Sequence, residues 1–142
     1  IECLVGSEMC IRDRLKKDLK ISNPDYVLIE LGGNDALRGY PVKKIKDNLK
    51  QMISLVKANN SKPLLMQIRI PPNYGQKYTY AFEKIYVDLA LAENINLLPF
   101  MLENIGVNSD LMQSDGIHPN KKAQAMIAKD VKKNLNKILF FK

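Results

Sequence analysis

The single histidine of the chain, His118, follows Asp115 at a spacing that suits acid–base chemistry. Gly116 lies between them and frees the backbone to turn, so that the carboxylate can accept a hydrogen bond from one imidazole nitrogen. Such a bond fixes the tautomer and stabilises the imidazolium that forms when the other nitrogen takes a proton. The pair is therefore a candidate general base with its orienting acid. The alternative is a surface histidine near the start of a helix.

A metal site is a weaker interpretation of the same residues. His118 is a lone imidazole without a cysteine nearby, and no carboxylate cluster stands close to it in the sequence. Transition metals in proteins usually take several imidazole or thiolate ligands. The sequence therefore predicts neither a metal nor another cofactor.

A second polar cluster, Gly32-Gly33-Asn34-Asp35, contains a neutral hydrogen-bond donor. The two glycines let the backbone turn sharply and approach a ligand closely. The Asn34 amide can then point into a pocket, where an oriented donor stabilises the oxyanion of an acyl-transfer reaction. The alternative is a tight turn closed by an Asx-type hydrogen bond.

The hydrophobic pattern around these clusters alternates between short apolar runs and amphipathic stretches. Short apolar runs bounded by turn residues are typical of buried strands, whereas apolar residues that recur at three and four positions predict helices. The order β-α-β-α-β-α predicts a parallel sheet covered by helices on both sides. The predicted strands are 26–31, 63–70 and 95–99, the predicted helices are 42–56, 78–92 and 123–138, and a further helix ends near Leu19.

Three connections leave the carboxyl ends of the predicted strands, at residues 32–40, 71–77 and 100–118. Ligands of open α/β sheets bind beyond these strand ends. The first connection carries Asn34, and the third carries Asp115 and His118. The two polar clusters are therefore predicted to serve one site.

Composition and charge narrow the function classes. The 142 residues, 46% of them hydrophobic, suffice for one domain with a modest core. The formal net charge is +7, but the lysines are scattered through helical stretches, and no aromatic or groove-helix pattern favours nucleic acid. No apolar run reaches the roughly 18 residues of a membrane span. The two cysteines, Cys3 and Cys10, indicate no disulfide framework.

Residues 1–14 differ from the rest of the chain. They contain both cysteines, show no clear period, and resemble a peptide translated from a sequencing adapter. We interpret 1–14 as a non-native segment and 15–142 as the C-terminal part of a single domain. No signal-peptide pattern is present at this start.

Taken together, the two clusters resemble the third and fifth sequence blocks of the SGNH (GDSL-type) hydrolases. The resemblance is to the bacterial branch of acyl-CoA thioesterase I, lysophospholipase and arylesterase, and it covers roughly residues 15–138. It rests on the stretches YVLIELGGNDALRGYP, PLLMQIRIPPNYGQKY and LMQSDGIHPN.

The resemblance implies a flavodoxin-like three-layer α/β/α sandwich and a role for several residues. His118 would be the general base that activates a serine, Asp115 would orient His118, and Asn34 would donate to the oxyanion. The family's substrate-facing loops correspond to 35–40 and 70–78. The substrate-binding residues implied in and beside these loops are Gly33, Asp35, Leu37, Pro72 and Tyr74.

The chain departs from the family pattern at its nucleophile. The family's serine lies in a Gly-Asp-Ser motif at the end of its first strand, and a second block supplies a further oxyanion-hole glycine. Neither is recognisable here, so we expect a fold that lacks the first strand and leave the nucleophile unknown. The alternative is a non-catalytic ligand-binding remnant on the same fold. The serines are Ser7, Ser22, Ser54, Ser61, Ser109 and Ser114, of which Ser114 has the most suitable position.

The expected partner is a small acyl ester or thioester, with no nucleic acid and no stable membrane insertion. The resemblance implies a periplasmic or secreted location, although this chain carries no signal segment that would show it. The sequence leaves the oligomeric state open.

Overall fold

The structure, a computed structural model, describes residues 8–139. The chain divides into two compact units, with the boundary between Leu97 and Leu98. Ser7 and the first half of the segment interpreted as non-native lie outside the described residues.

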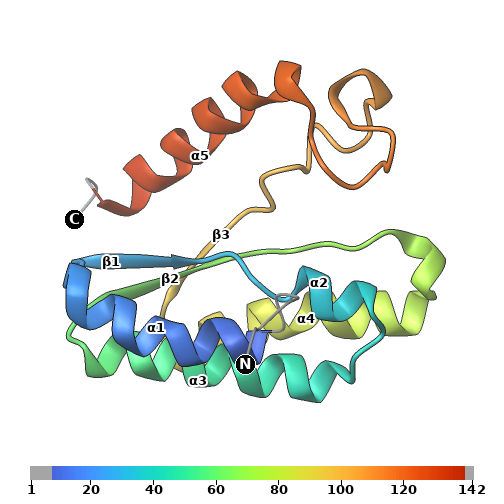
Figure 1. The fold of residues 1–142 in the computed structure, drawn as a ribbon. Coiled ribbons are helices and arrows are strands. Elements are labelled where there is room, and N and C mark those ends of the chain that lie inside the picture. The colour runs from blue at the N-terminus through green and yellow to red at the C-terminus, as the bar shows by residue number, and fades with distance from the viewer. Residues whose placement is uncertain (1–7, 140–142) are drawn as a thin grey trace. The chain divides into compact units, whose positions relative to one another are not determined.

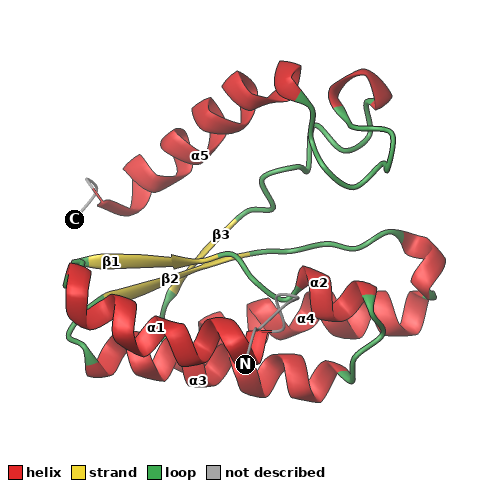
Figure 2. Cartoon of the chain, in the orientation of Figure 1, coloured by secondary structure: helices red, strands yellow, loops and turns green. Residues whose placement is uncertain are grey.

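The first unit alternates helices and strands in the predicted order (Figures 1 and 2). The three predicted strands and all predicted helices except 123–138 have counterparts here, and a short helix, α2, occupies part of the first predicted connection. The elements are α1 (Glu8–Ser22), β1 (Tyr26–Ile29), α2 (Gly33–Leu37), α3 (Val42–Ala58), β2 (Lys62–Met66), the 3-10 turn η1 (Pro72–Tyr74), α4 (Gln76–Glu93) and β3 (Asn96–Leu98), whose last residue belongs to the second unit.

The sheet has three strands in the order β1-β2-β3. Strands β1 and β2 run parallel, with Tyr26 opposite Lys62 and Ile29 opposite Leu65. Helices α3 and α4 contact β2, and α1 packs on α3, so that these helices cover one face of the sheet (Figure 1).

The core of the first unit lies between this face and the helices. Its α3 residues recur at three and four positions, which places them on one buried stripe. The fully buried side chains of α3 are Ile45, Leu49, Met52, Ile53 and Val56, and those contributed by the strands and α4 include Ile29, Leu65, Phe82 and Tyr86.

The prediction of a buried strand at 26–31 was wrong in part. The strand ends at Ile29, and Tyr26 and Leu28 are 36% and 38% exposed. Side chains alternate between the two faces of a strand. Val27 and Ile29 therefore pack against the core, while Tyr26 and Leu28 point to the opposite face of the sheet.

The second unit consists of turns followed by one long helix. It contains the 3-10 turns η2 (Ser109–Leu111) and η3 (Lys121–Ala123) and the helix α5 (Gln124–Leu139), which corresponds to the predicted helix 123–138. Leu102, Ile105 and Ala123 form its small core. No described helix is long and apolar enough to cross a membrane.

Helix α1 begins at Glu8, inside the segment interpreted as non-native. Its residues Ile11 and Leu15 are partly buried and pack against the core of the first unit. The interpretation of 1–14 as non-native remains a prediction.

Candidate active site

Asp115 and His118 form a close pair in the second unit. Oδ2 of Asp115 lies 2.7 Å from Nδ1 of His118. Oδ1 of the same carboxylate accepts hydrogen bonds from the backbone N–H groups of Ile117, at 2.9 Å, and of His118, at 3.0 Å. Gly116 has a φ of +66°, a left-handed conformation that glycine adopts readily, and it lies in the turn that the sequence predicted between the two residues. The carboxylate thus holds both the turn and the imidazole.

A network of backbone bonds supports the His118 turn. The N–H of Gln113 donates to the carbonyl of His118 at 2.8 Å, and Met112 pairs with Pro119 in an antiparallel bridge. The backbone of His118 is therefore held on both sides of the turn.

Asn120 is a structural residue of this site for which no role was predicted from the sequence. Its side-chain nitrogen donates to the carbonyls of Asp110, at 2.7 Å, and Met112, at 3.1 Å, and its oxygen accepts from the N–H of Lys122. Asn120 is the cap of η3. An asparagine just before a helical stretch is a helix-start signal and could have indicated this role.

Hydrogen bonding lowers the pKa of Asp115 to about 2. The main cause is the backbone N–H of His118, followed by the His118 ring and the N–H of Ile117. These donors favour the ionised carboxylate. Asp115 is therefore an anion at every pH at which esters are usually assayed, as an acid that stabilises an imidazolium must be.

This pKa predicts an acid transition in the turn. Because the folded pKa lies below the ordinary 3.8, ionised Asp115 stabilises the turn above pH 3.8, and this contribution is lost as the pH falls through about 2. We expect the Ile117 and His118 amide resonances to titrate with a midpoint near pH 2 in an NMR series. Asp115→Asn should lack the step, and a midpoint at 3.8 or above would contradict the geometry.

Asn34 is the second residue of α2 in the first unit, and its side chain is exposed. Gly32 precedes the helix with a φ of +116°, and its carbonyl accepts from the N–H of Ala36 at 3.0 Å. Gly33 lies close to Ile68, since a Cβ added there would stand 3.3 Å from Ile68 Cγ2. The glycine pair thus permits the turn that exposes Asn34.

The predicted substrate-binding residues lie in different environments. Asp35 is only 1% exposed, its Oδ1 has no hydrogen-bond partner among the described atoms, and burial raises the pKa of its carboxyl. Leu37 is half-buried against the core, whereas Pro72 and Tyr74 are exposed in η1. The contacts of these residues with a substrate remain predictions.

Two tyrosines of α4 contact the turn that carries Asn34. The hydroxyl of Tyr86 donates to the carbonyl of Leu31, and that of Tyr78 donates to the carbonyl of Tyr40. Neither tyrosine was predicted from the sequence to belong to the site. The only available signal was a pair of tyrosines eight residues apart on a predicted helix, which does not reveal a partner.

The two predicted clusters belong to different units. Gly33, Asn34 and Asp35 lie in the first unit, and Asp115 and His118 lie in the second. The structure brings Asp115 and His118 together. That Asn34 and the Asp115–His118 pair serve one site remains a prediction.

Several described serines use their hydroxyls in local hydrogen bonds. The hydroxyls of Ser22 and Ser54 donate to carbonyls four residues earlier, and that of buried Ser61 donates to Pro24 at 2.6 Å. Ser109 and Ser114 are exposed. No described serine is hydrogen-bonded to His118.

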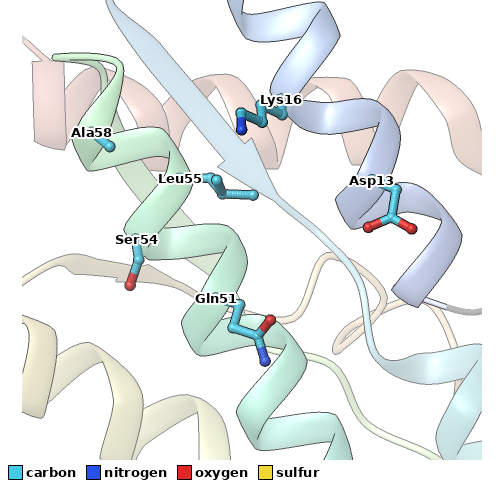
Figure 3. Close-up of a pocket in the computed structure, with 6 residues that line it drawn as sticks. All are labelled: Asp13, Lys16, Gln51, Ser54, Leu55 and Ala58. Atoms are coloured by element: carbon cyan, nitrogen blue, oxygen red, sulfur yellow. The ribbon is translucent and has the colours of Figure 1, made fainter.

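A hollow of about 550 Å³ lies between α1 and α3 (Figure 3). None of the predicted site residues lines it. Within residues 8–139, no group of three or more His, Cys, Asp or Glu side chains is placed to hold a metal ion. The hollow is lined by Asp13, Lys16, Gln51, Ser54, Leu55 and Ala58.

The fold is that of known esterases. The crystal structure of the psychrotrophic esterase EstA from Pseudoalteromonas sp., inhibited by monoethylphosphonate, matches with a TM-score of 0.91 and 40% identity, over 94% of this chain and 73% of that chain. The predicted α/β fold of the SGNH hydrolases is therefore confirmed.

The chain belongs to the GDSL-like lipase/acylhydrolase family, whose model matches residues 7–126. It is 47% identical over 126 residues to thioesterase 1/protease 1/lysophospholipase L1 of Escherichia coli (strain K12) and to an arylesterase of Vibrio mimicus. Each match covers 89% of this chain. The chain spans 61% and 63% of these relatives, about three-fifths of their length.

Proposed function

We propose that this protein is a serine-dependent hydrolase of acyl esters or thioesters, of the arylesterase, acyl-CoA thioesterase or lysophospholipase type. The observation that carries the proposal is the 2.7 Å contact between Asp115 and Nδ1 of His118. It leaves Nε2 without a bond to any described residue, and the ring is 66% exposed. The names of the relatives as thioesterase, lysophospholipase and arylesterase support the same chemistry.

In the proposed reaction, Nε2 of His118 takes the proton of a serine hydroxyl while the serine oxygen bonds to the acyl carbon. The carbonyl oxygen becomes an oxyanion and accepts a hydrogen bond from the Asn34 amide. The oxyanion then re-forms the carbonyl as the bond from the acyl carbon to the leaving oxygen or sulfur breaks, and the imidazolium gives its proton to the leaving alcohol or thiol. Water repeats the sequence on the acyl-serine and releases the acid. Asp115 stays ionised throughout and stabilises the imidazolium.

The alternative of a non-catalytic ligand-binding protein is favoured by one observation. Among residues 8–139, no serine hydroxyl is hydrogen-bonded to His118 or Asp115. A protein that only binds its ligand has no need of an oriented base, so we place hydrolysis first. From the family resemblance we also propose a small-molecule acyl substrate and a periplasmic or secreted location.

In the deciding experiment, the coding DNA upstream of the Leu15 codon is sequenced without adapter ligation. The complete reading frame is then expressed and assayed. We expect an apolar strand that ends in Gly-Asp-Ser, and a product that hydrolyses p-nitrophenyl esters or acyl-CoA. A confirmed start at Ile1–Arg14, without such a strand and with no turnover, would instead establish the binding protein.

Removal of the Asn34 amide is expected to weaken transition-state binding in the complete product. Asn34→Ala should cost about 2.7–4 kcal/mol, or about 10²–10³ in kcat, because a single oxyanion-hole donor in other hydrolases has this effect. Asn34→Asp keeps the shape but replaces the donor with a charged acceptor, and should lose at least as much. Steady-state kinetics on a short p-nitrophenyl ester measure the effect.

The matched control is Asn104→Ala, since Asn104 is exposed in a turn of the second unit. This variant should keep the activity of the unchanged protein. If Asn34→Ala also retained full kcat, Asn34 would have no role in the oxyanion hole.

A further inference from the structure

We infer that Tyr78 and Tyr86 of α4 are positioning residues that hold the turn carrying Asn34 from both sides. This inference rests on the proposed function, because Asn34 is there the oxyanion donor. It assigns to α4 a task beyond covering the sheet, which is to set where the Asn34 amide points.

Tyr86 holds the turn before Asn34. Its ring is fully buried and packs edge-on against Phe82, with ring centroids 5.4 Å apart. Its hydroxyl donates to the carbonyl of Leu31 at 2.8 Å. Burial raises the pKa of this phenol well above its ordinary value, so it remains a neutral donor at any working pH.

The contact between Tyr86 and the turn also explains why residue 32 is a glycine. A Cβ added at Gly32 would collide with the Tyr86 hydroxyl. In addition, the φ of +116° is one that side chains rarely adopt. The backbone of Gly32 and the Tyr86 hydroxyl therefore pack closely against each other, in the segment between the end of β1 and the start of α2.

Tyr78 holds the turn after Asn34. Its hydroxyl donates to the carbonyl of Tyr40 at 2.6 Å and lies 3.3 Å from that of Ala36. Burial is the main cause that raises the pKa of this phenol, and the nearby carboxylate of Asp35 adds to the effect. Tyr78 is therefore also a neutral donor at assay pH.

Asn34 lies in the chain between Leu31 and Tyr40, the residues whose carbonyls accept from the two tyrosine hydroxyls. The side chain of Asn34 itself makes no hydrogen bond to a described residue. The placement of its amide therefore depends on the backbone of the turn. That backbone is closed by short-range bonds, from Ala36 N to Gly32 O at 3.0 Å and from Tyr40 N to Asp35 O at 3.0 Å. A donor misplaced by about 1 Å can cost about 100-fold in rate. The two tyrosine hydrogen bonds are therefore expected to affect the rate of the proposed reaction through the position of the Asn34 amide.

The test on the chain itself compares Tyr78→Phe and Tyr86→Phe, which remove only the hydroxyls. Tyr80→Phe is the matched control, because Tyr80 lies on the same helix, is 70% exposed and bonds no described carbonyl. Amide hydrogen exchange is followed by NMR at Ala36, Arg38, Gly39 and Tyr40. Amides of the buried α3 residues Met52 and Ile53 report global opening.

Loss of either hydroxyl is expected to speed exchange in the turn about five-fold or more, as fits the loss of one hydrogen bond that breaks when the turn opens. Exchange at Met52 and Ile53 should accelerate by no more than this factor, because the same bond also breaks on global opening. The Tyr80→Phe control should exchange like the unchanged chain. Unaltered exchange in the turn, with or without faster exchange at Met52 and Ile53, would overturn the inference, because the hydroxyls would then not hold the turn closed.

The second part of the test measures the steady-state kinetics of the same variants in the complete gene product. Each hydroxyl deletion should lower kcat about ten-fold at unchanged KM, because the oxyanion donor acts in the transition state rather than in substrate binding. Faster exchange with an unchanged kcat would also overturn the inference. If the complete product shows no hydrolysis at all, the proposed function fails, and the positioning role of the tyrosines toward an oxyanion donor fails with it. The exchange data would still show whether they hold the turn.

Discussion

Replacing His118 with alanine is expected to lower the kcat of the complete gene product by about a million-fold, the loss seen when the base is removed from a serine hydrolase. His118 is the only histidine of the chain, and histidine is the side chain that most often acts as general base in enzymes. Without it, nothing takes the proton of an attacking serine. Single-turnover hydrolysis of p-nitrophenyl acetate measures the loss.

The fold should survive this change. The backbone bond from Gln113 to His118, the Met112–Pro119 bridge and the Asn120 cap do not involve the imidazole. An unchanged amide spectrum over residues 109–123 is the control. If His118→Ala kept full activity against a short acyl ester, the proposed mechanism would be wrong.

Replacing Asp115 with asparagine is expected to lower kcat about ten-thousand-fold, as the same change does in another Ser-His-Asp enzyme. The asparagine oxygen can still accept from the N–H groups of Ile117 and His118, so the turn should persist. Its NH₂ group then faces Nδ1 in place of an acceptor. The imidazole must therefore carry its proton on Nε2, where it can no longer act as a base.

Asp110→Asn is the matched control for this prediction. Asp110 lies in the same turn region, and its backbone N–H and carbonyl are held by Asn108 and Asn120, whereas the hydrogen bond to the His118 ring comes from Asp115. It should retain the activity of the unchanged protein. Equal activity in Asp115→Asn and Asp110→Asn would show that the Asp115–His118 hydrogen bond has no role in catalysis.

The helices show what a local pattern can predict. The apolar stripe of α3 predicted a helix over 42–56, and the structure has it at Val42–Ala58. The period of buried residues is a property of the stretch itself, so no knowledge of its neighbours is needed.

The strands show where such a pattern stops being informative. The apolar run 63–70 predicted a long strand, but β2 ends at Met66. The register pairs β1 with β2 only as far as Ile29 and Leu65, and the chain turns at Gly32 soon after. The length of β2 therefore depends on how far the neighbouring strand pairs with it. The apolar run of β2 holds no information about that neighbour.

The sequence by itself determined the Asp115–His118 pair, because the two residues lie three positions apart and a glycine between them permits the turn. Only the tertiary structure decided that Asp35 is buried and that Tyr78 and Tyr86 hold the Asn34 turn. These tyrosines bond carbonyls 38 and 55 residues away along the chain. Contacts within one turn follow from local geometry, whereas contacts over such separations exist only once the helices have packed on the sheet.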